Sequence, residues 1–243
     1  MKTTSIILAG LLTSALATQA VTLTVDGTVN NHSSTSDYTV VTVTNIGTLN
    51  LTGGALTLTQ TSGANNATRF NLNGGSTLNF FDGVHTINER INTAGATSTV
   101  RVTGSLATIN VHQQSAFNAT MDFVFDAAGI STFDSDSRLG FGSSAITIDA
   151  SAYTGGDATF VLVDTELFGG TYANDGGGFG TIGTIVAPTG YTATFDQSKF
   201  DGDPVDGFTG EITVTLAAVP EPGTYALLGG IFALSYVMVR RRS

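Results

Sequence analysis

LNLTGGALTL, residues 49–58, alternates apolar and polar side chains on either side of a Gly-Gly step. A strict two-residue alternation is the period of a β-strand with one buried face. The paired glycines permit positive φ and therefore a sharp change of direction between two short strands. The stretch predicts two strand segments joined at a bend, with leucines directed inward and Asn or Thr directed outward.

The same pattern recurs further along the chain. FNLNGG at 70–75 precedes LNF at 78–80, and VRVTG at 100–104 precedes INV at 109–111. The first recurrence lies 21 residues on from the first unit, and the second lies 30 further. A period of about twenty residues is typical of a parallel β-helix, in which no single coil buries its apolar face alone. A β-sandwich of hairpins also fits, because NGG and TGG steps are turn signals.

These Thr-, Asn- and Gly-rich units resemble the passenger repeats associated with autotransporters. The periodicity and this resemblance together favour an all-β protein with a parallel β-helix-like solenoid over about 39–115. We assign residues 21–115 to these repeats.

Residues 116–218 differ in texture from the repeats. Longer strands with bulkier side chains, such as MDFVFD at 121–126 and TFVLVD at 159–164, are separated by Gly- and Asp-rich turns. EITVTL at 211–216 is the last predicted strand. This pattern predicts a β-sandwich-like C-terminal region that caps the solenoid and covers its unpaired edge.

Residues 1–20 have the layout of a secretory signal peptide. Lys2 gives a positive start, residues 6–16 are apolar, and small residues form a cleavage site ending at Ala20, with Ala17 as the alternative. We therefore expect the protein to be exported.

The chain ends with VPEPGTYALLGGIFALSYVMVRRRS, residues 219–243. Pro220 and Pro222 keep the start of this segment extended. Residues 223–239 carry no charged side chain, and as a helix they would span about 25 Å, slightly less than a hydrocarbon core of about 30 Å. Arg240–Arg242 follow and suit the cytoplasmic side of a membrane. We predict a single C-terminal transmembrane helix over 223–239, and a permanent single-pass anchor remains an alternative use of it.

The order of these features resembles the PEP-CTERM sorting signal, a tail found on exported proteins of Gram-negative bacteria that make extracellular polysaccharide. The resemblance covers residues 219–243. It implies recognition by an exosortase, a membrane transpeptidase-like processing enzyme, after transient residence in the inner membrane. It assigns a sorting motif and a membrane stop, formed by Pro220, Glu221 and Pro222 and by Arg240, Arg241 and Arg242.

The segment between the two ends, residues 21–219, is strongly acidic. Its five Lys and Arg and eighteen Asp and Glu give a net charge of −13. Such a charge repels nucleic acid, which we exclude as a partner, and attracts divalent cations. The chain has no cysteine, so disulfides, thiolate chemistry and Cys-based zinc sites are excluded.

The acidic turn FDGDPVDG, residues 200–207, is the best candidate for a ligand site. Asp201, Asp203 and Asp206 offer the hard oxygen ligands that Ca²⁺ prefers. The spacing departs from that of an EF-hand, and helices are not predicted on either side. A solvated turn is therefore the favoured interpretation, with Ca²⁺ as the alternative and no other cofactor expected.

Signals for catalysis are weak. GFGTIG at 178–183 matches the letters of a dinucleotide-binding loop, but Pro188 follows where that site needs a helix. His32, His85 and His112 lack the spacing of a zinc site, and there is no G-x-S-x-G motif. We therefore expect no enzyme activity.

These observations predict an exported, non-enzymatic structural or adhesive protein. We expect it at the cell envelope surface or in the extracellular matrix, with extracellular polysaccharide as a candidate partner. Two alternatives remain. One is a polysaccharide lyase or hydrolase on a β-helix scaffold, with paired carboxylates contributed by different coils. The other is a calcium-dependent adhesin.

Overall fold

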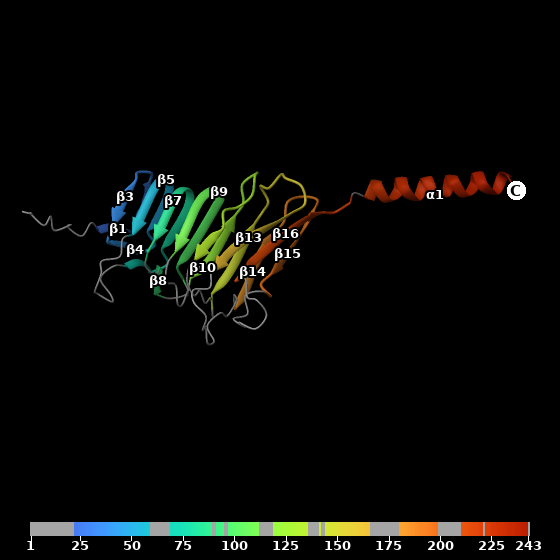
Figure 1. Cartoon of the computed structure of the whole chain (residues 1–243). Helices are drawn as coiled ribbons and strands as arrows, with labels where there is room; N and C mark the ends of the chain where they lie inside the picture. The colour runs from blue at the N-terminus through green and yellow to red at the C-terminus, as the bar shows by residue number, and fades with distance from the viewer. Residues whose placement is uncertain are drawn as a thin grey trace, which may run out of the picture.

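The body of the protein is built almost entirely from β-strands. The computed structural model describes residues 22–58, 69–88, 91–94, 97–111, 119–135, 141, 144–165, 180–198, 210–220 and 222–242. These residues form sixteen strands and one C-terminal helix, which confirms the prediction of a β body. Figure 1 shows the strands side by side along the body, with the helix extending from one end.

The smaller sheet contains four short strands in the order β1-β4-β6-β8. They are β1 (Thr22–Asp26), β4 (Val40–Thr44), β6 (Arg69–Asn73) and β8 (Ile91–Ala94). Every neighbouring pair is parallel.

The larger sheet is built around three long parallel strands, β5 (Thr48–Leu58), β7 (Thr77–Ile87) and β9 (Thr99–Val111). The first part of β5 pairs with β2 (Val29–His32), and its last part pairs with β3 (Ser36–Tyr38). The single long strand β5 therefore pairs with two separate strands, β2 and β3.

On its other side β9 is divided in the same way. Its first part pairs with β10 (Thr120–Val124), and its last part pairs with β11 (Phe133–Ser135). Parallel pairing continues from β10 to β12 (Ala145–Asp149) and then to β14 (Thr181–Val186). The parallel arrangement therefore extends well beyond residue 115.

Antiparallel pairing is found at the C-terminal end of the body. β11 pairs in parallel with β13 (Ala158–Thr165). Next to β13 lies β16 (Ile212–Ala218), and beyond it lies β15 (Tyr191–Asp196); both of these contacts are antiparallel. The chain therefore places its last strand between two earlier ones.

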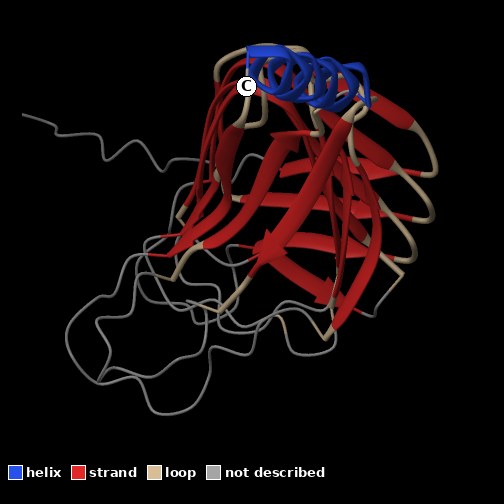
Figure 2. Ribbon diagram, turned by 90° about the vertical axis from the view of Figure 1, so that its right-hand side faces the viewer, coloured by secondary structure: helices blue, strands red, loops and turns tan. Residues whose placement is uncertain are grey.

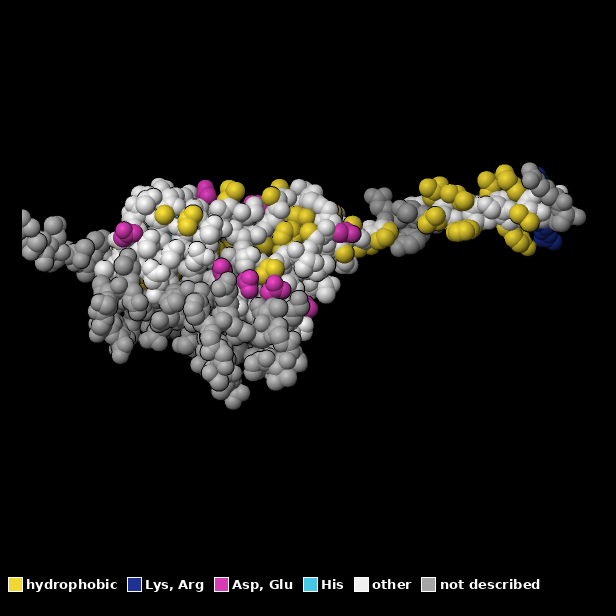
Figure 3. All heavy atoms as spheres, in the orientation of Figure 1, with side chains coloured by type: hydrophobic (Ala, Val, Ile, Leu, Met, Phe, Trp, Pro, Cys, Tyr) yellow, Lys and Arg dark blue, Asp and Glu magenta, His cyan; other side chains and the backbone are white. Residues whose placement is uncertain are grey.

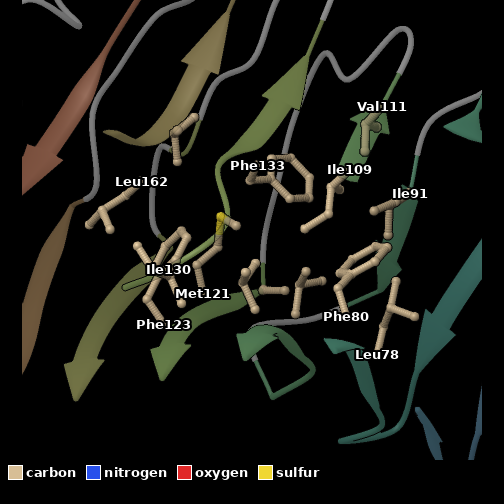
Figure 4. Packing of buried hydrophobic residues seen from close by; sticks show 14 of the residues in the cluster. Leu78, Phe80, Ile91, Ile109, Val111, Met121, Phe123, Ile130, Phe133 and Leu162 are labelled. Carbon is tan, nitrogen blue, oxygen red and sulfur yellow. The ribbon is translucent and has the colours of Figure 1, made fainter. Parts of the chain in front are cut away.

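Inward side chains form rows across the larger sheet because each strand is paired in register with the next. In these rows, the side chains on strands that have a neighbouring strand on each side are buried. One row consists of His32, Leu51, Phe80, Val102, Phe123, Ile148 and Ile185. Figure 2 shows the two sheets facing a common interior, and Figure 4 shows Phe80, Phe123 and Phe133 packed within it.

The predicted 21-residue alignment of the repeats is wrong. Leu49 pairs with Leu78, 29 positions later, whereas Phe70 lies in the other sheet and pairs with Val41. LNLTGG and FNLNGG look alike because each is a strand that leads into a glycine bend. Local pattern alone does not tell which sheet such a strand joins.

The bends of the long strands depend on glycine, as the Gly-Gly step predicts. Gly54, Gly83 and Gly104 have φ values of 68°, 99° and 71°. A side chain on Gly83 would also collide with the carbonyl oxygen of Gly54 in the neighbouring bend. Glycine is therefore needed at Gly83 both for its conformation and for the close approach of the two bends.

The turn between β4 and β5 departs from this rule. Asn45 and Ile46 have φ values of 52° and 63°, where the corresponding turn between β6 and β7 has Gly74 and Gly75. The Ile46 N–H donates to the carbonyl of Gly74 at 3.1 Å, so the two turns lie against each other. Ile46 is 80% exposed, and burial does not offset the cost of about 1–2 kcal/mol for its left-handed conformation.

Substitution Ile46→Asn is expected to raise the free energy of unfolding by about 1 kcal/mol, because Asn tolerates the left-handed region better than a β-branched residue. Urea denaturation measures the change. Val29→Asn is the matched control, since Val29 is also exposed but lies in a strand and has no positive φ. An equal gain in both variants, or none at Ile46, would show that the turn stores no strain.

Candidate functional site

The predicted sorting motif begins where the chain leaves the β body. The N–H of Ala218, the last residue of β16, donates to Asp157 Oδ1 at 2.7 Å. The N–H of Val219 donates to the carbonyl of Gly190, also at 2.7 Å. Val219 and Pro220 are exposed. The β body is therefore held by backbone hydrogen bonds as far as Val219, and Val219 and Pro220 are accessible at its surface.

The structure places most of the predicted motif and stop residues around one helix. Pro222 is the first residue of α1 (Pro222–Arg242), a position at which proline is favourable, and Glu221 lies outside the described residues. Arg240, Arg241 and Arg242 form the end of the helix, where positive charge interacts favourably with the helix dipole.

Helix α1 extends away from the strands rather than packing on them (Figure 1). Apolar side chains cover it along its length, as Figure 3 shows, and each of the following is about half exposed or more. They are Leu227, Leu228, Ile231, Phe232, Leu234, Val237, Met238 and Val239. A helix this apolar normally has a partner for its surface.

The prediction of a helix over 223–239 is confirmed, but its prediction as a transmembrane helix is corrected. In the described part of the chain no helix is both long and apolar enough to cross a membrane. Gly229, Gly230, Ser235 and Tyr236 interrupt the apolar run and lower its mean hydropathy.

Several other predicted site residues fall outside the described ranges. They are the cleavage residue Ala20, the candidate calcium ligands Asp201, Asp203 and Asp206, and His112. Among the residues that are described, no three His, Asp or Glu side chains lie together as a metal site would require.

On the outer face of the larger sheet, polar side chains form a ladder that parallels the inward rows. The Asn50 amide donates to Asn31 Oδ1 at 2.8 Å, and the Asn79 amide donates to Asn50 Oδ1 at 3.3 Å. On the next two strands, β9 and β10, Arg101 Nε donates to Asp122 Oδ2 at 2.7 Å. These contacts bind neighbouring strands to one another and leave Asp122 paired.

The Asp126 carboxylate accepts four hydrogen bonds. It accepts from the N–H and hydroxyl of Ser105 at 2.8 and 2.9 Å, and from the N–H groups of Ala128 and Gly129 at 2.8 Å. Burial opposes its ionisation, but these donors outweigh burial and lower the pKa of Asp126. An ionised carboxylate surrounded by donors fixes the bend at Gly104 and has no proton to give as a general acid.

Substitution Asp126→Asn is expected to lower the free energy of unfolding by about 2 kcal/mol, because an amide directs an NH₂ group at one set of donors. Asp149→Asn is the matched control. Asp149 accepts hydrogen bonds from one described residue, Ser151, whereas Asp126 accepts them from three. Replacement of Asp149 is therefore expected to lower the free energy of unfolding by less than replacement of Asp126.

The pH dependence of the Asp126 variant provides a second measurement. The pKa of Asp126 is lower in the folded state than its usual value of 3.8. The contribution of the ionised Asp126 carboxylate to the free energy of unfolding is therefore complete above pH 3.8 and is lost as the pH falls through the folded-state pKa. Acid denaturation followed by circular dichroism should show this loss of stability at low pH in the parent and not in Asp126→Asn. Identical acid profiles would contradict the role assigned to Asp126.

Sequence analysis did not identify Asp126, the Arg101–Asp122 pair or the polar ladder, because their partners come from different strands. The only sequence signal was the outward position of these residues in the alternating pattern. The chain matches no protein-family model, no curated protein and no solved structure. The exposed junction before α1 is thus the best-defined candidate site in the described residues.

Proposed function

We propose that the chain is an exported, non-enzymatic structural or adhesive protein of the cell surface or extracellular matrix. The observation that carries this proposal is the exposed junction at Val219 and Pro220, between a hydrogen-bonded β body and a protruding apolar helix. A processing enzyme can reach the backbone there without unfolding the body. The carboxylates of Asp122 and Asp126 hold strands and a bend together, which favours a structural over a catalytic protein.

The tail serves as a PEP-CTERM-type sorting signal in this proposal. Pro220, Glu221 and Pro222 form the motif read by an exosortase-type enzyme, and Arg240–Arg242 retain the precursor. The exposed apolar side chains of α1 support a transient association with the inner membrane surface. The mature protein is then delivered to the envelope surface or matrix, where the uncharged outward Asn and Thr side chains suit a hydroxyl-rich polysaccharide.

The proposed architecture is a parallel β-helix-like solenoid with a β-sandwich-like C-terminal region. In-register parallel pairing, inward apolar rows and glycine bends at the same place in successive long strands support it. The antiparallel strands β13, β16 and β15 support a cap at the C-terminal end.

Excision of residues 77–98 tests the solenoid. Thr77 pairs with Thr48 on one side and Thr99 on the other, so in the proposed architecture residues 77–98 correspond to one coil. Its removal brings Thr48 beside Thr99 with every inward row preserved, and the shortened chain is expected to unfold cooperatively in a thermal melt followed by circular dichroism. Removal of 77–87 alone is the control, because it deletes a strand and leaves its return path. If neither shortened chain folds, the coils are not modular and the solenoid proposal fails.

Processing at the junction is tested by mass spectrometry of the surface-located protein. We expect its C-terminus to lie near Pro220–Pro222, without Arg240–Arg242. Pro220→Ala/Pro222→Ala is expected to retain the whole tail in the membrane fraction, because the extended motif is lost. Glu211→Gln, upstream in the same region, is the control and is expected to be processed normally. Recovery of Arg240–Arg242 on the surface-located parent protein would overturn the sorting proposal.

A further inference from the structure

Two free strand edges lie at opposite ends of a parallel run in the larger sheet. From β9 this run continues through β10 and β12 to β14, and on the other side through β7 and β5 to β2. Among the described strands, β2 pairs with β5 alone and β14 pairs with β12 alone. Figure 1 shows β1 and β3 at one end of the body and β14 towards the other. All strands of the run point in the same direction, so its two ends present complementary parallel edges.

The inward side of β14 is exposed although it continues a buried row. Ile182 pairs with Ile146, and the apolar members of this row on the preceding strands are buried. They are Leu49, Leu78, Val100, Met121 and Ile146. Ile182 itself is 49% exposed, and no residue of β14 is buried. The row therefore ends in an apolar side chain that one more parallel strand would cover.

Neither β2 nor β14 carries the residues that usually protect an edge strand. Both strands, VNNH at 29–32 and TIGTIV at 181–186, are without Lys, Arg, Asp, Glu and Pro. The other strands of the larger sheet with a single described neighbour are β3 and β15, and they carry Asp37 and Asp196. In a body this acidic, pairing between two copies is repelled least at the uncharged edges.

The sequence of β14 is similar to that of the strand on which β2 already lies. β2 pairs in register with TLNL at 48–51, a threonine followed by two inward leucines. β14 has a threonine, Thr181, followed by the inward Ile182 and Ile185, with one extra residue at the register shift between them. The β2 strand of a second copy can therefore lie beside Thr181 and Ile182 with contacts of the same kind, while its other edge stays paired with its own β5.

We propose that copies of this chain associate end to end, with β14 of one copy pairing in parallel with β2 of the next. The interface joins two different edges, so each dimer keeps one free edge of each kind. Association therefore continues into a linear assembly unless a ring closes. The occupant of the β14 edge is a second copy because β2 has the direction, the register and the uncharged side chains that this edge requires. The inference rests on strand pairing and is independent of the proposed export and processing.

Introduced cysteines test the pairing directly, because the chain has no cysteine of its own. Val29 is 69% exposed, Thr181 is exposed, and the proposed register places them side by side. Neighbouring strands lie about 4.8 Å apart, which is within reach of a disulfide. The full chain with Val29→Cys/Thr181→Cys, kept in mild detergent to cover α1, is expected to form a ladder of multimers on oxidation. Non-reducing gel electrophoresis measures the ladder, and its absence would overturn the proposal.

Single variants distinguish end-to-end pairing from a symmetrical contact. Val29→Cys alone and Thr181→Cys alone are expected to remain monomeric on the gel, because neither edge pairs with its like. A mixture of the two single variants is expected to give dimers and no larger product. Dimers of either single variant in the same yield as in the mixture would overturn the proposal.

Thr108→Cys/Thr181→Cys is the matched control for clustering through α1. Thr108 is also exposed, but it lies on β9, which pairs with β7 and β11. This control is expected to give no ladder, and ladders of equal yield in the two double variants would reject the pairing.

A charge on the edge of β14 identifies the strand that forms the contact. Ile182→Lys, added to Val29→Cys/Thr181→Cys, is expected to remove the ladder while the circular dichroism spectrum stays that of the parent. A ladder that persists in this folded variant would show that β14 does not form the contact. The mixture of single variants decides the question if Ile182→Lys does not fold.

Discussion

In-register parallel pairing is the constraint on which the rest of the body depends. A parallel strand finds partners for its backbone N–H and carbonyl groups only on its neighbours, so none of these strands is stable alone. From β2 to β14 the paired segments also place each inward side chain beside its counterpart, and the register shifts fall between those segments. The interior is consequently a set of rows, such as the one through Leu51, Phe80 and Val102. A one-residue slip of a whole strand would turn its inward side chains outward.

The bends are where this regular arrangement requires particular residues. Gly54, Gly83 and Gly104 turn the long strands, and Asp126 binds the bend at Gly104 from the following segment. On the outer face, amide and charged side chains bind one strand to the next in the direction of stacking. Polar groups at the bends and on the surface thus reinforce the register that the apolar rows require.

Local features of the chain were predictable from its sequence. Alternation in LNLTGGALTL gave both halves of β5, the glycines gave the bend between them, and the apolar run before Arg240 gave helix α1. The alignment of the units was not predictable, because Leu49 and Phe70 have similar neighbours yet lie in different sheets. Only the return path of the chain, which differs in length from unit to unit, decides which strands become neighbours.

The same distinction applies to the candidate site, whose local features were predictable from the sequence and whose contacts between distant residues were not. Its position after the last strand could be placed from the order of Pro220, Pro222 and the arginines, since these residues are adjacent in the chain. The prediction that α1 crosses a membrane was wrong, since the described residues contain no helix that is both long and apolar enough to do so.

The position of β16 has a consequence for how the chain reaches its native state. β13 and β15 are made before it, yet each has β16 as its antiparallel neighbour. A chain that emerges from its N-terminus can assemble the parallel rungs as they appear, but the far end stays open until residues 212–218 arrive. Completion of the body therefore depends on β16, and a chain truncated before it leaves an edge of β13 and the strand β15 without this partner and available for aggregation.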